Sequence, residues 1–182
     1  RQEIGDLLGI AAIYNNLGEV YQKLGDFQQA HHYLLEAVDL LTEIGEKRFL
    51  NDAYKLLAEV ELKLGDTQSA LMYGERSLIL AQEIGNREYE GITCRVLGQI
   101  HRAEGALETA RTRLETSIEI LTELDNKLEI AHSYEALGRT LLEMGERAEG
   151  RIALQRAIDI FEELGLEKEV EDARRALNQT QG

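Results

Sequence analysis

The sequence of 182 residues contains no proline and no tryptophan, and aromatic residues make up only 5% of it. Proline in a helix interior costs about 3 kcal/mol, so its absence permits long uninterrupted helices. The abundant residues, among them Leu, Ala, Glu, Ile and Arg, are all compatible with helices. The sequence therefore predicts an all-α chain.

A single cysteine, Cys94, cannot form a disulfide within the chain, which favours a reducing, cytoplasmic compartment. No apolar run approaches the roughly 20 residues that a membrane-spanning helix requires. Positive charge is also scarce, because 20 Lys and Arg stand against 34 Asp and Glu, and the formal net charge is −14. Nucleic acids and anionic membranes attract basic surfaces, so we expect neither as a partner.

Glycine recurs with a period of twenty residues, at Gly5, Gly25, Gly45, Gly65, Gly85, Gly105, Gly145 and Gly165, and the gap in this series holds Asp125. Glycine just beyond a helix adopts the left-handed conformation that ends it, and Asp is among the few residues that tolerate this conformation. We therefore expect helices of about seventeen residues, joined by loops of two or three residues that make neighbours antiparallel. The prediction is eight helices in four hairpins, followed by a ninth.

Apolar residues between these glycines follow the spacing of a helix face, and Ile13, Leu17, Val20 and Leu24 form one such stripe. Alternate segments differ, so the true repeat is forty residues long. The first helices contain "YNNLGEVY" (14–21), "YKLLAEVE" (54–61), "CRVLGQIH" (94–101) and "YEALGRTL" (134–141). The second helices carry a small residue and, four positions later, Leu: Ala30 and Leu34, Ala110 and Leu114, Gly150 and Leu154, with Ala70 and Gly74 as the exception.

This pattern resembles the tetratricopeptide repeat, which has aromatic-x2-Leu-Gly-x2-aromatic in its first helix and Ala-x3-Phe in its second. The first repeat fills these positions with Tyr14, Leu17, Gly18, Tyr21, Ala30 and Leu34. The Leu-Gly step recurs at residues 97–98 and 137–138, and as Leu57-Ala58 at 57–58. The usual repeat has 34 residues and a proline near its end, so both helices are longer here. The pattern is also similar to Leu-Gly-Asn repeat proteins and to arrays in large bacterial signalling regulators.

The resemblance implies a right-handed α-solenoid of antiparallel helix hairpins, with four repeats and a C-terminal capping helix. We expect the repeats at residues 5–44, 45–84, 85–124 and 125–164, and the capping helix with its tail at 165–182. Residues 1–4 read "RQEI", like the ends of the second helices, which predicts that they are the remnant of a preceding repeat in a longer array. The apolar face exposed by the missing repeat would allow end-to-end self-association.

Motifs for catalysis are missing, because the sequence has no Walker loop, HExxH, Cys-x2-Cys pair or Gly-x-Ser-x-Gly. Cys94 and His101 share one helix face, but they occupy the slots of the two tyrosines of the first repeat and are interpreted as core residues. A lone Glu-x2-His at 129–132 cannot form a di-iron site, and the adjacent His31 and His32 diverge by about 100° around a helix. We expect no metal, no cofactor and no enzymatic activity.

The family geometry implies a concave groove lined by the first helices. By register, its side chains are Asn15, Glu19, Lys23, Lys55, Glu59, Lys63, Arg95, Gln99, Arg102, Glu135 and Arg139, with Gln22, Asp52, His132, Leu142 and Glu143 beside them. These residues either only solvate the inner surface or bind a peptide. In the second case Lys55, Lys63, Arg95 and Arg102 would hold carboxylates of an extended or helical segment, while Asn15 and Gln99 contact its backbone. A chaperone-tail clamp would require Asn in place of Glu19.

Three functions are compatible with the sequence. The first is a non-catalytic scaffold that binds a protein or peptide segment, with acidic residues among its contacts, in the concave groove. The alternative is a sensor or regulatory segment of a larger multidomain signalling protein. An enzyme in a helical-repeat fold has only the abundance of carboxylates in its favour.

Overall fold

The computed structural model describes residues 2–178, and within that range the chain forms α-helices and short turns without a strand. The helices are α1 (Gln2–Leu24), α2 (Phe27–Ile44), α3 (Lys47–Leu64), α4 (Thr67–Glu83), α5 (Arg87–Ala103), α6 (Leu107–Glu123), α7 (Lys127–Glu143), α8 (Arg147–Glu163) and α9 (Glu167–Asn178). The turns between them have two or three residues, as the glycine period predicted. The predicted all-α fold of helix hairpins is confirmed. Within the described residues, no helix combines the length and the apolar character that a bilayer crossing requires.

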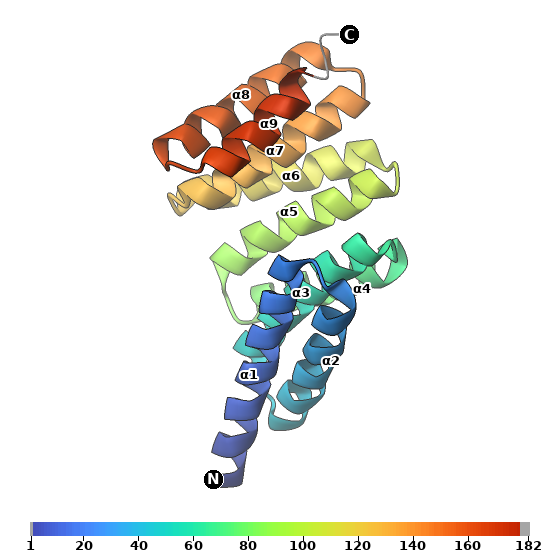
Figure 1. The fold of residues 1–182 in the computed structure, drawn as a ribbon, viewed down its shortest axis with the longest axis vertical. Coiled ribbons are helices and arrows are strands. Elements are labelled where there is room, and N and C mark those ends of the chain that lie inside the picture. The colour runs from blue at the N-terminus through green and yellow to red at the C-terminus, as the bar shows by residue number, and fades with distance from the viewer. Residues whose placement is uncertain (1, 179–182) are drawn as a thin grey trace. The chain divides into compact units, whose positions relative to one another are not determined.

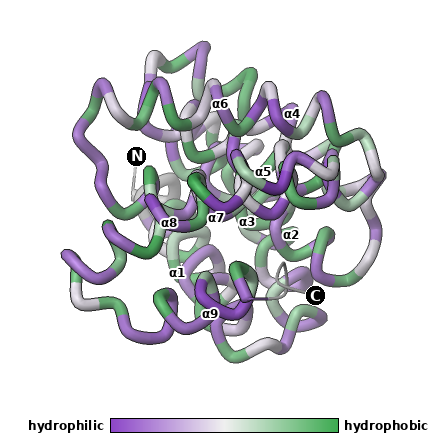
Figure 2. Tube along the Cα trace, turned by 90° about the horizontal axis from the view of Figure 1, so that it is seen from above, coloured by the Kyte–Doolittle hydropathy of each residue, from purple (hydrophilic) through white to green (hydrophobic). Residues whose placement is uncertain are grey.

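The chain divides into two compact units, with the division inside α5 between Val96 and Leu97. In unit 1, α1 pairs with α2, α3 pairs with α4, and α2 and α3 join the two hairpins, while α1 also contacts α3 (Figure 1). In unit 2, α7 contacts both α6 and α8, and α8 contacts α9. Hydrophobic and hydrophilic residues are interspersed along the helices, as expected of amphipathic helices (Figure 2).

Each turn between helices contains a left-handed residue, and several turns add a residue whose side chain caps the next helix. Seven glycines of the twenty-residue series have positive φ, between 68° and 88°, and Asp125 takes their place with a φ of 52°. The residue after the glycine often caps the next helix: the carboxylates of Asp26 and Asp66 accept hydrogen bonds from the backbone N–H of Gln29 and Ser69. This pairing is the physical reason for the recurring "LGD" at 24–26 and 64–66, since Gly ends one helix and Asp begins the next.

Gly5 does not follow this rule. The sequence predicted that a helix ends there, but α1 begins at Gln2 and continues through Gly5 to Leu24. Residues 2–4 are therefore part of α1, and Arg1 lies outside the described residues. The prediction of a helix end at Gly5 is wrong, because glycine lowers helix stability by only about 1 kcal/mol and does not by itself stop a helix.

The stripe predicted on α1 is also not where the core lies. The exposed fractions of Ile13, Val20 and Leu24 are 57%, 50% and 73%. The side of α1 that packs in unit 1 instead carries Ala11, which is fully buried, and Gly18. Small residues occupy that side because α2 approaches it closely.

The Leu-Gly step is explained by this close approach within each hairpin. A Cβ atom at Gly18 would lie 2.5 Å from Cγ of Leu34 on the second helix. A Cβ atom at Gly138 would lie 2.6 Å from Cγ of Leu154 and 2.9 Å from the carbonyl oxygen of Gly150. Real Cβ atoms do not come this close to other atoms, so the Leu side chain occupies the space that the missing Cβ leaves.

The second repeat reverses the sizes at the same two positions. Ala58 stands at the position of Gly18, and Gly74 stands at the position of Leu34. Both residues are buried. The two departures from the pattern therefore belong together, because a methyl group on the first helix is matched by the loss of a side chain on the second.

Successive hairpins are joined through small residues at equivalent positions. In unit 1, Ser77 Oγ lies 3.1 Å from Thr93 Oγ1, and in unit 2, Ser117 Oγ lies 2.9 Å from Ser133 Oγ, with all four side chains buried. The equivalent positions at the ends of the chain hold alanines, namely Ala37 with Ala53 and Ala157 with Ala173. The buried hydroxyls satisfy one another by hydrogen bonding, so the Ser and Thr pairs keep the same close contact between small residues as the Ala pairs.

We expect Gly138→Ala to lower the free energy of unfolding by about 1–3 kcal/mol, because the new methyl group overlaps Leu154 and the backbone of Gly150. Urea denaturation followed by circular dichroism measures the change. Gly9→Ala is the matched control, since Gly9 lies in α1 with no atom within 4 Å of its Cβ position. The control should be neutral or stabilising by up to about 1 kcal/mol. A Gly138→Ala protein as stable as the parent would contradict the close-packing explanation.

Replacing Asp125 tests the turn in the same assay. Asp125→Gly should raise the free energy of unfolding by up to about 1 kcal/mol, because glycine adopts a φ of 52° without steric cost. Asp125→Ala removes the carboxylate but keeps the Cβ, and it should give no gain. Equal stability of the glycine variant and the parent would mean that the Asp side chain offsets its own backbone strain.

Candidate functional site

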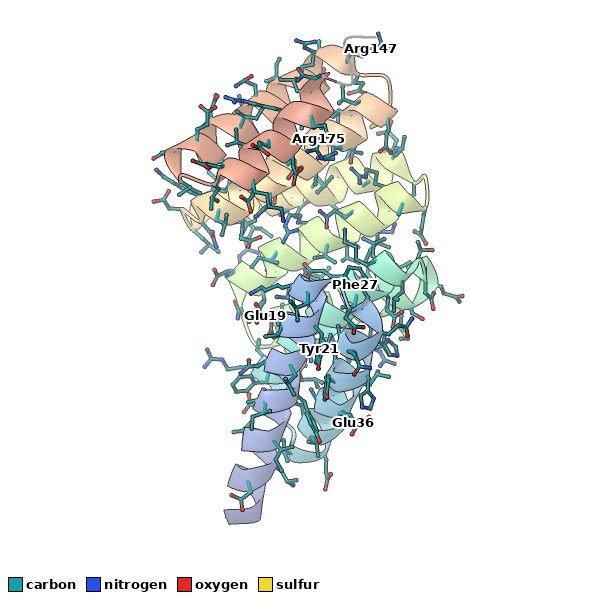
Figure 3. The ribbon with its side chains drawn as sticks, viewed as in Figure 1. Glu19, Tyr21, Phe27, Glu36, Arg147 and Arg175 are labelled. Carbon is teal, nitrogen blue, oxygen red and sulfur yellow. The ribbon has the colours of Figure 1, made fainter. Side chains whose placement is uncertain are left out.

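The predicted groove residues of the first two repeats lie on the first helices of unit 1. We call this surface the first-helix face of unit 1 and define it by Asn15, Glu19, Gln22 and Lys23 on α1, Asp52, Lys55, Glu59 and Lys63 on α3, and Arg95 on α5. Figure 3 shows Glu19 beside α1, whereas Tyr21 lies between α1 and α2, where it packs on Ala30 and Leu34. Tyr21 thus belongs to the core of the hairpin, whereas Glu19 belongs to the face.

Side chains on this face bridge neighbouring first helices. The side-chain amide of Asn15 donates a hydrogen bond of 2.7 Å to Asp52, and that of Gln22 donates one of 2.8 Å to Glu59. Arg95 approaches the other oxygen of Glu59 at 4.0 Å. Glu59 thus connects α1, α3 and α5, and the face is a ladder of polar contacts.

Lys55 and Arg95 are the two most enclosed cations on the face, and Lys55 has the closer carboxylate. The Nζ atom of Lys55 lies 3.0 Å from Asp52 Oδ1 and 5.8 Å from the centre of the Tyr89 ring. Burial by itself would lower the pKa of Lys55, but attraction to Asp52 and Glu59 outweighs burial and raises the pKa above the ordinary 10.5. These ion pairs stabilise the folded chain below the ordinary lysine pKa, and their contribution is lost as the pH rises through the raised pKa of Lys55.

Two lysines at the end of the face are much more accessible. The side chain of Lys23 is 72% exposed and lies 2.6 Å from Glu19, four residues earlier on α1. Lys63 is exposed, and none of the ion pairs or hydrogen bonds of the described residues includes it. A surface pair such as Lys23 with Glu19 contributes little, at most about 1 kcal/mol, so an incoming carboxylate can replace Glu19.

The other predicted groove residues lie in unit 2, on α5 and α7. Arg102 Nε is 3.8 Å from Glu143, and Arg139 donates to Glu135 at 2.7 Å and to the backbone carbonyl of Asp172 on α9 at 3.3 Å. Gln99 is half-buried on α5. Unit 2 thus has a polar first-helix surface of its own, again built from cations beside carboxylates.

The basic cluster expected from the sequence is divided and mostly paired. Lys55, Lys63 and Arg95 lie in unit 1, and Arg102 lies in unit 2. Lys55, Arg95 and Arg102 each lie near at least one carboxylate of the chain itself, and among these four Lys63 remains the most available for a partner. The register did not reveal these pairings, because Glu59 and Glu143, the carboxylates near Arg95 and Arg102, come from neighbouring first helices, while Asp52 pairs with Lys55 on α3 itself.

Tyr89 is a member of this face that the sequence reasoning missed. Burial raises its pKa, as does the charge of Asp52, to which its hydroxyl donates a hydrogen bond. Tyr89 lies in the first turn of α5, outside the forty-residue motif, so the repeat pattern gave no signal for it. It adds an aromatic ring to the otherwise polar ladder.

The residues considered for metal or redox chemistry lie apart from this face. Cys94 is buried, as the core interpretation predicted, and His101 is half-buried with Nδ1 3.3 Å from Glu104. His31 instead has a partner that the sequence did not suggest: its Nδ1 lies 2.6 Å from Oε1 of the buried Glu61. Within the described residues, no group of three or more His, Cys, Asp or Glu side chains is arranged to hold a metal ion.

Family models of the tetratricopeptide repeat match the sequence over residues 49–123, 92–163 and 10–44. No curated protein matches it. The solved structure of BtubC from P. vanneervenii is similar at 21% identity with a TM-score of 0.79, over 96% of this chain and 72% of that one. A signal-transduction ATPase with a tetratricopeptide repeat sensor from Pyrococcus horikoshii is similar at 18% identity with a TM-score of 0.78, over 96% of this chain and 27% of that one. A Rap protein complexed with Competence and Sporulation Factor is similar at 16% identity with a TM-score of 0.85, over 95% of this chain and 52% of that one.

At these identities the likeness shows the fold alone. The chain spans about a quarter of the ATPase and about half of the Rap protein.

Removing the carboxylate of Glu59 tests the ladder. We expect Glu59→Gln to lower the pKa of Lys55, because one of the two negative charges that raise it is lost. The pKa is measured by an NMR pH titration of the Lys55 side chain, assigned with Lys55→Arg. Glu19→Gln is the matched control, since Glu19 pairs with Lys23 and should leave the Lys55 pKa unchanged. An unaltered Lys55 pKa in Glu59→Gln would contradict the ladder.

Proposed function

We propose that this chain, which belongs to the tetratricopeptide repeat family, is a non-catalytic scaffold that binds a peptide or protein segment on the first-helix face of unit 1. The observation that carries the proposal is the ladder that joins α1, α3 and α5 through Asn15, Asp52 and Glu59. It holds amide donors, carboxylate acceptors and an aromatic ring on one preformed surface. A preformed surface binds a segment with little loss of side-chain entropy.

The partner best suited to this face is an extended or helical segment that brings both acceptors and donors. Carboxylates of the segment would contact Lys63 and Lys23, the most accessible cations of the face. The carbonyl oxygen Oδ1 of Asn15 is buried without a hydrogen-bond donor, so a small rotation of its side chain would offer it to a backbone N–H of the segment. A segment with acidic side chains alone would have to compete with Asp52 and Glu59 for the cations Lys55 and Arg95.

Absence of catalysis is part of the proposal. Tetratricopeptide repeats generally act as scaffolds, and Lys55 and Arg95, the enclosed cations of this face, lie beside carboxylates of the face itself. General acid–base catalysis on the face would need a side chain whose pKa lies near neutral pH.

A second candidate is a sensor or regulatory segment of a larger signalling protein in a cytoplasmic setting. Two observations favour it. The chain resembles 27% of an ATPase that has a tetratricopeptide repeat sensor, and it divides into two compact units within a single helix, α5. A helix that belongs to two units can transmit a change in one to the other.

Peptide selection tests the scaffold function. Binding peptides are selected from a displayed random library on the immobilised chain, and their dissociation constants are measured by fluorescence anisotropy. We expect Lys23→Glu with Lys63→Glu to raise the dissociation constant at least about tenfold, because the accessible cations of the face are reversed. Arg147→Glu with Lys168→Glu, on α8 and α9, makes the same charge change outside the face and should alter it less than about twofold.

Circular dichroism confirms that all variants are folded before they are compared. Selected peptides that bind the face variant as well as the parent, or that respond only to the control, would overturn the proposed site. Failure to select any peptide would contradict the scaffold function and leave the sensor candidate.

A further inference from the structure

One helix of unit 1 has an apolar surface that no described residue covers. This α1 stripe consists of Ile10, Ile13, Leu17, Val20 and Leu24. The exposed fractions of Ile10, Ile13, Val20 and Leu24 are 42%, 57%, 50% and 73%, and Leu17 is half-buried. Apolar side chains gathered in this way on one helix mark a site of interaction.

The composition of α1 also indicates that the side of the helix that bears the stripe is covered. Twelve consecutive residues, from Leu7 to Gly18, carry no charge. The equivalent segments 47–58, 87–98 and 127–138 each contain three or four charged residues, in a chain that is 30% charged. A solvent-facing helix side normally carries charge, so α1 has the composition of a helix with little surface left in water.

The same positions are buried in the later repeats. Val20 corresponds to Val60 and Ile100, which are both fully buried, and Leu17 corresponds to the fully buried Leu57 and Leu97. In the second repeat of unit 1 the second helix of the preceding hairpin covers the first helix, since Leu34 on α2 packs with Leu57 and Val60 on α3. The α1 stripe is thus a packing surface by its register in the repeat.

Ile13 distinguishes the stripe from its equivalents. At this position the later helices have small residues, Ala53, Thr93, Ser133 and Ala173, and each is matched by a small residue of the preceding second helix. An isoleucine there leaves no room for the same close approach. The covering helix therefore differs from the ordinary second helix of a repeat.

The α1 stripe is complementary to itself. If two copies of α1 pack antiparallel about a two-fold axis at Leu17, Ile10 faces Leu24 of the other copy and Ile13 faces Val20. The outer side of α9 offers no such match, because it carries Glu171, Arg174 and Arg175. We propose that the occupant of the α1 stripe is the α1 stripe of a second copy of this chain, in an isologous dimer.

Sedimentation velocity over a range of concentrations tests the dimer. The parent should show a reversible monomer–dimer equilibrium. Ile13→Glu with Val20→Glu should weaken it at least about 100-fold, because each dimer would bury four unpaired carboxylates. Ile79→Glu with Ile152→Glu is the matched control: both residues are as exposed, at 63% and 58%, but lie on α4 and α8, and their replacement should leave the equilibrium unchanged.

Cross-linking distinguishes the mode of pairing. A cysteine at the axis, Leu17→Cys, should be joined to its copy by a short bis-maleimide, whereas Ile79→Cys and the parent, whose Cys94 is buried, should not. A parent that is monomeric at all concentrations, or a dimer insensitive to the stripe variant, would overturn the proposal. So would a dimer that needs the stripe but does not cross-link through position 17, because the stripe would then contact another surface.

Discussion

The close approach of two helices within each hairpin is the constraint on which the structure depends. Where the first helix has glycine, at Gly18, Gly98 or Gly138, a leucine of the second helix fills the space of the missing Cβ. This contact fixes how the two helices cross, and therefore which residues of the first helix turn away from the core. The polar ladder of unit 1 lies next to that contact, because Asn15 and Gln22 stand three residues before and four residues after Gly18 on α1, so the position of the candidate binding face depends on the packing of the hairpin.

The sequence predicted the local structure well because its signals are local. A glycine in the left-handed conformation and a carboxylate that caps the next helix act within a few residues, and even the substitution at Asp125 could be assigned correctly. The failures came where a local signal was ambiguous. Gly5 has the period of a helix end but lies inside α1, and Ile13 and Val20 have the spacing of a core stripe but lie at the surface. Periodicity identifies an apolar side but not what covers it.

The candidate site could be predicted only in part. Register placed Asn15, Lys55 and Arg95 on first helices correctly, since that follows from helix geometry. It could not show that Lys55 pairs with Asp52 and lies against Tyr89, or that Glu59 serves two neighbours. All of these contacts depend on side-chain geometry, and those of Tyr89 and Glu59 also join residues of different repeats. The structure thus changes the hypothesis from a basic groove for acidic peptides to a mixed polar face with two accessible lysines.

The central claim is that a segment binds on the first-helix face of unit 1. The most direct measurement is an NMR titration of a selected peptide into the chain, observing the side-chain amides of Asn and Gln. The account predicts that the resonances of Asn15 and Gln22 shift with the peptide concentration, while those of Gln28 and Gln155, which are exposed on the second helices, do not. Shifts confined to Gln28 or Gln155 would contradict it and would place binding on the second helices.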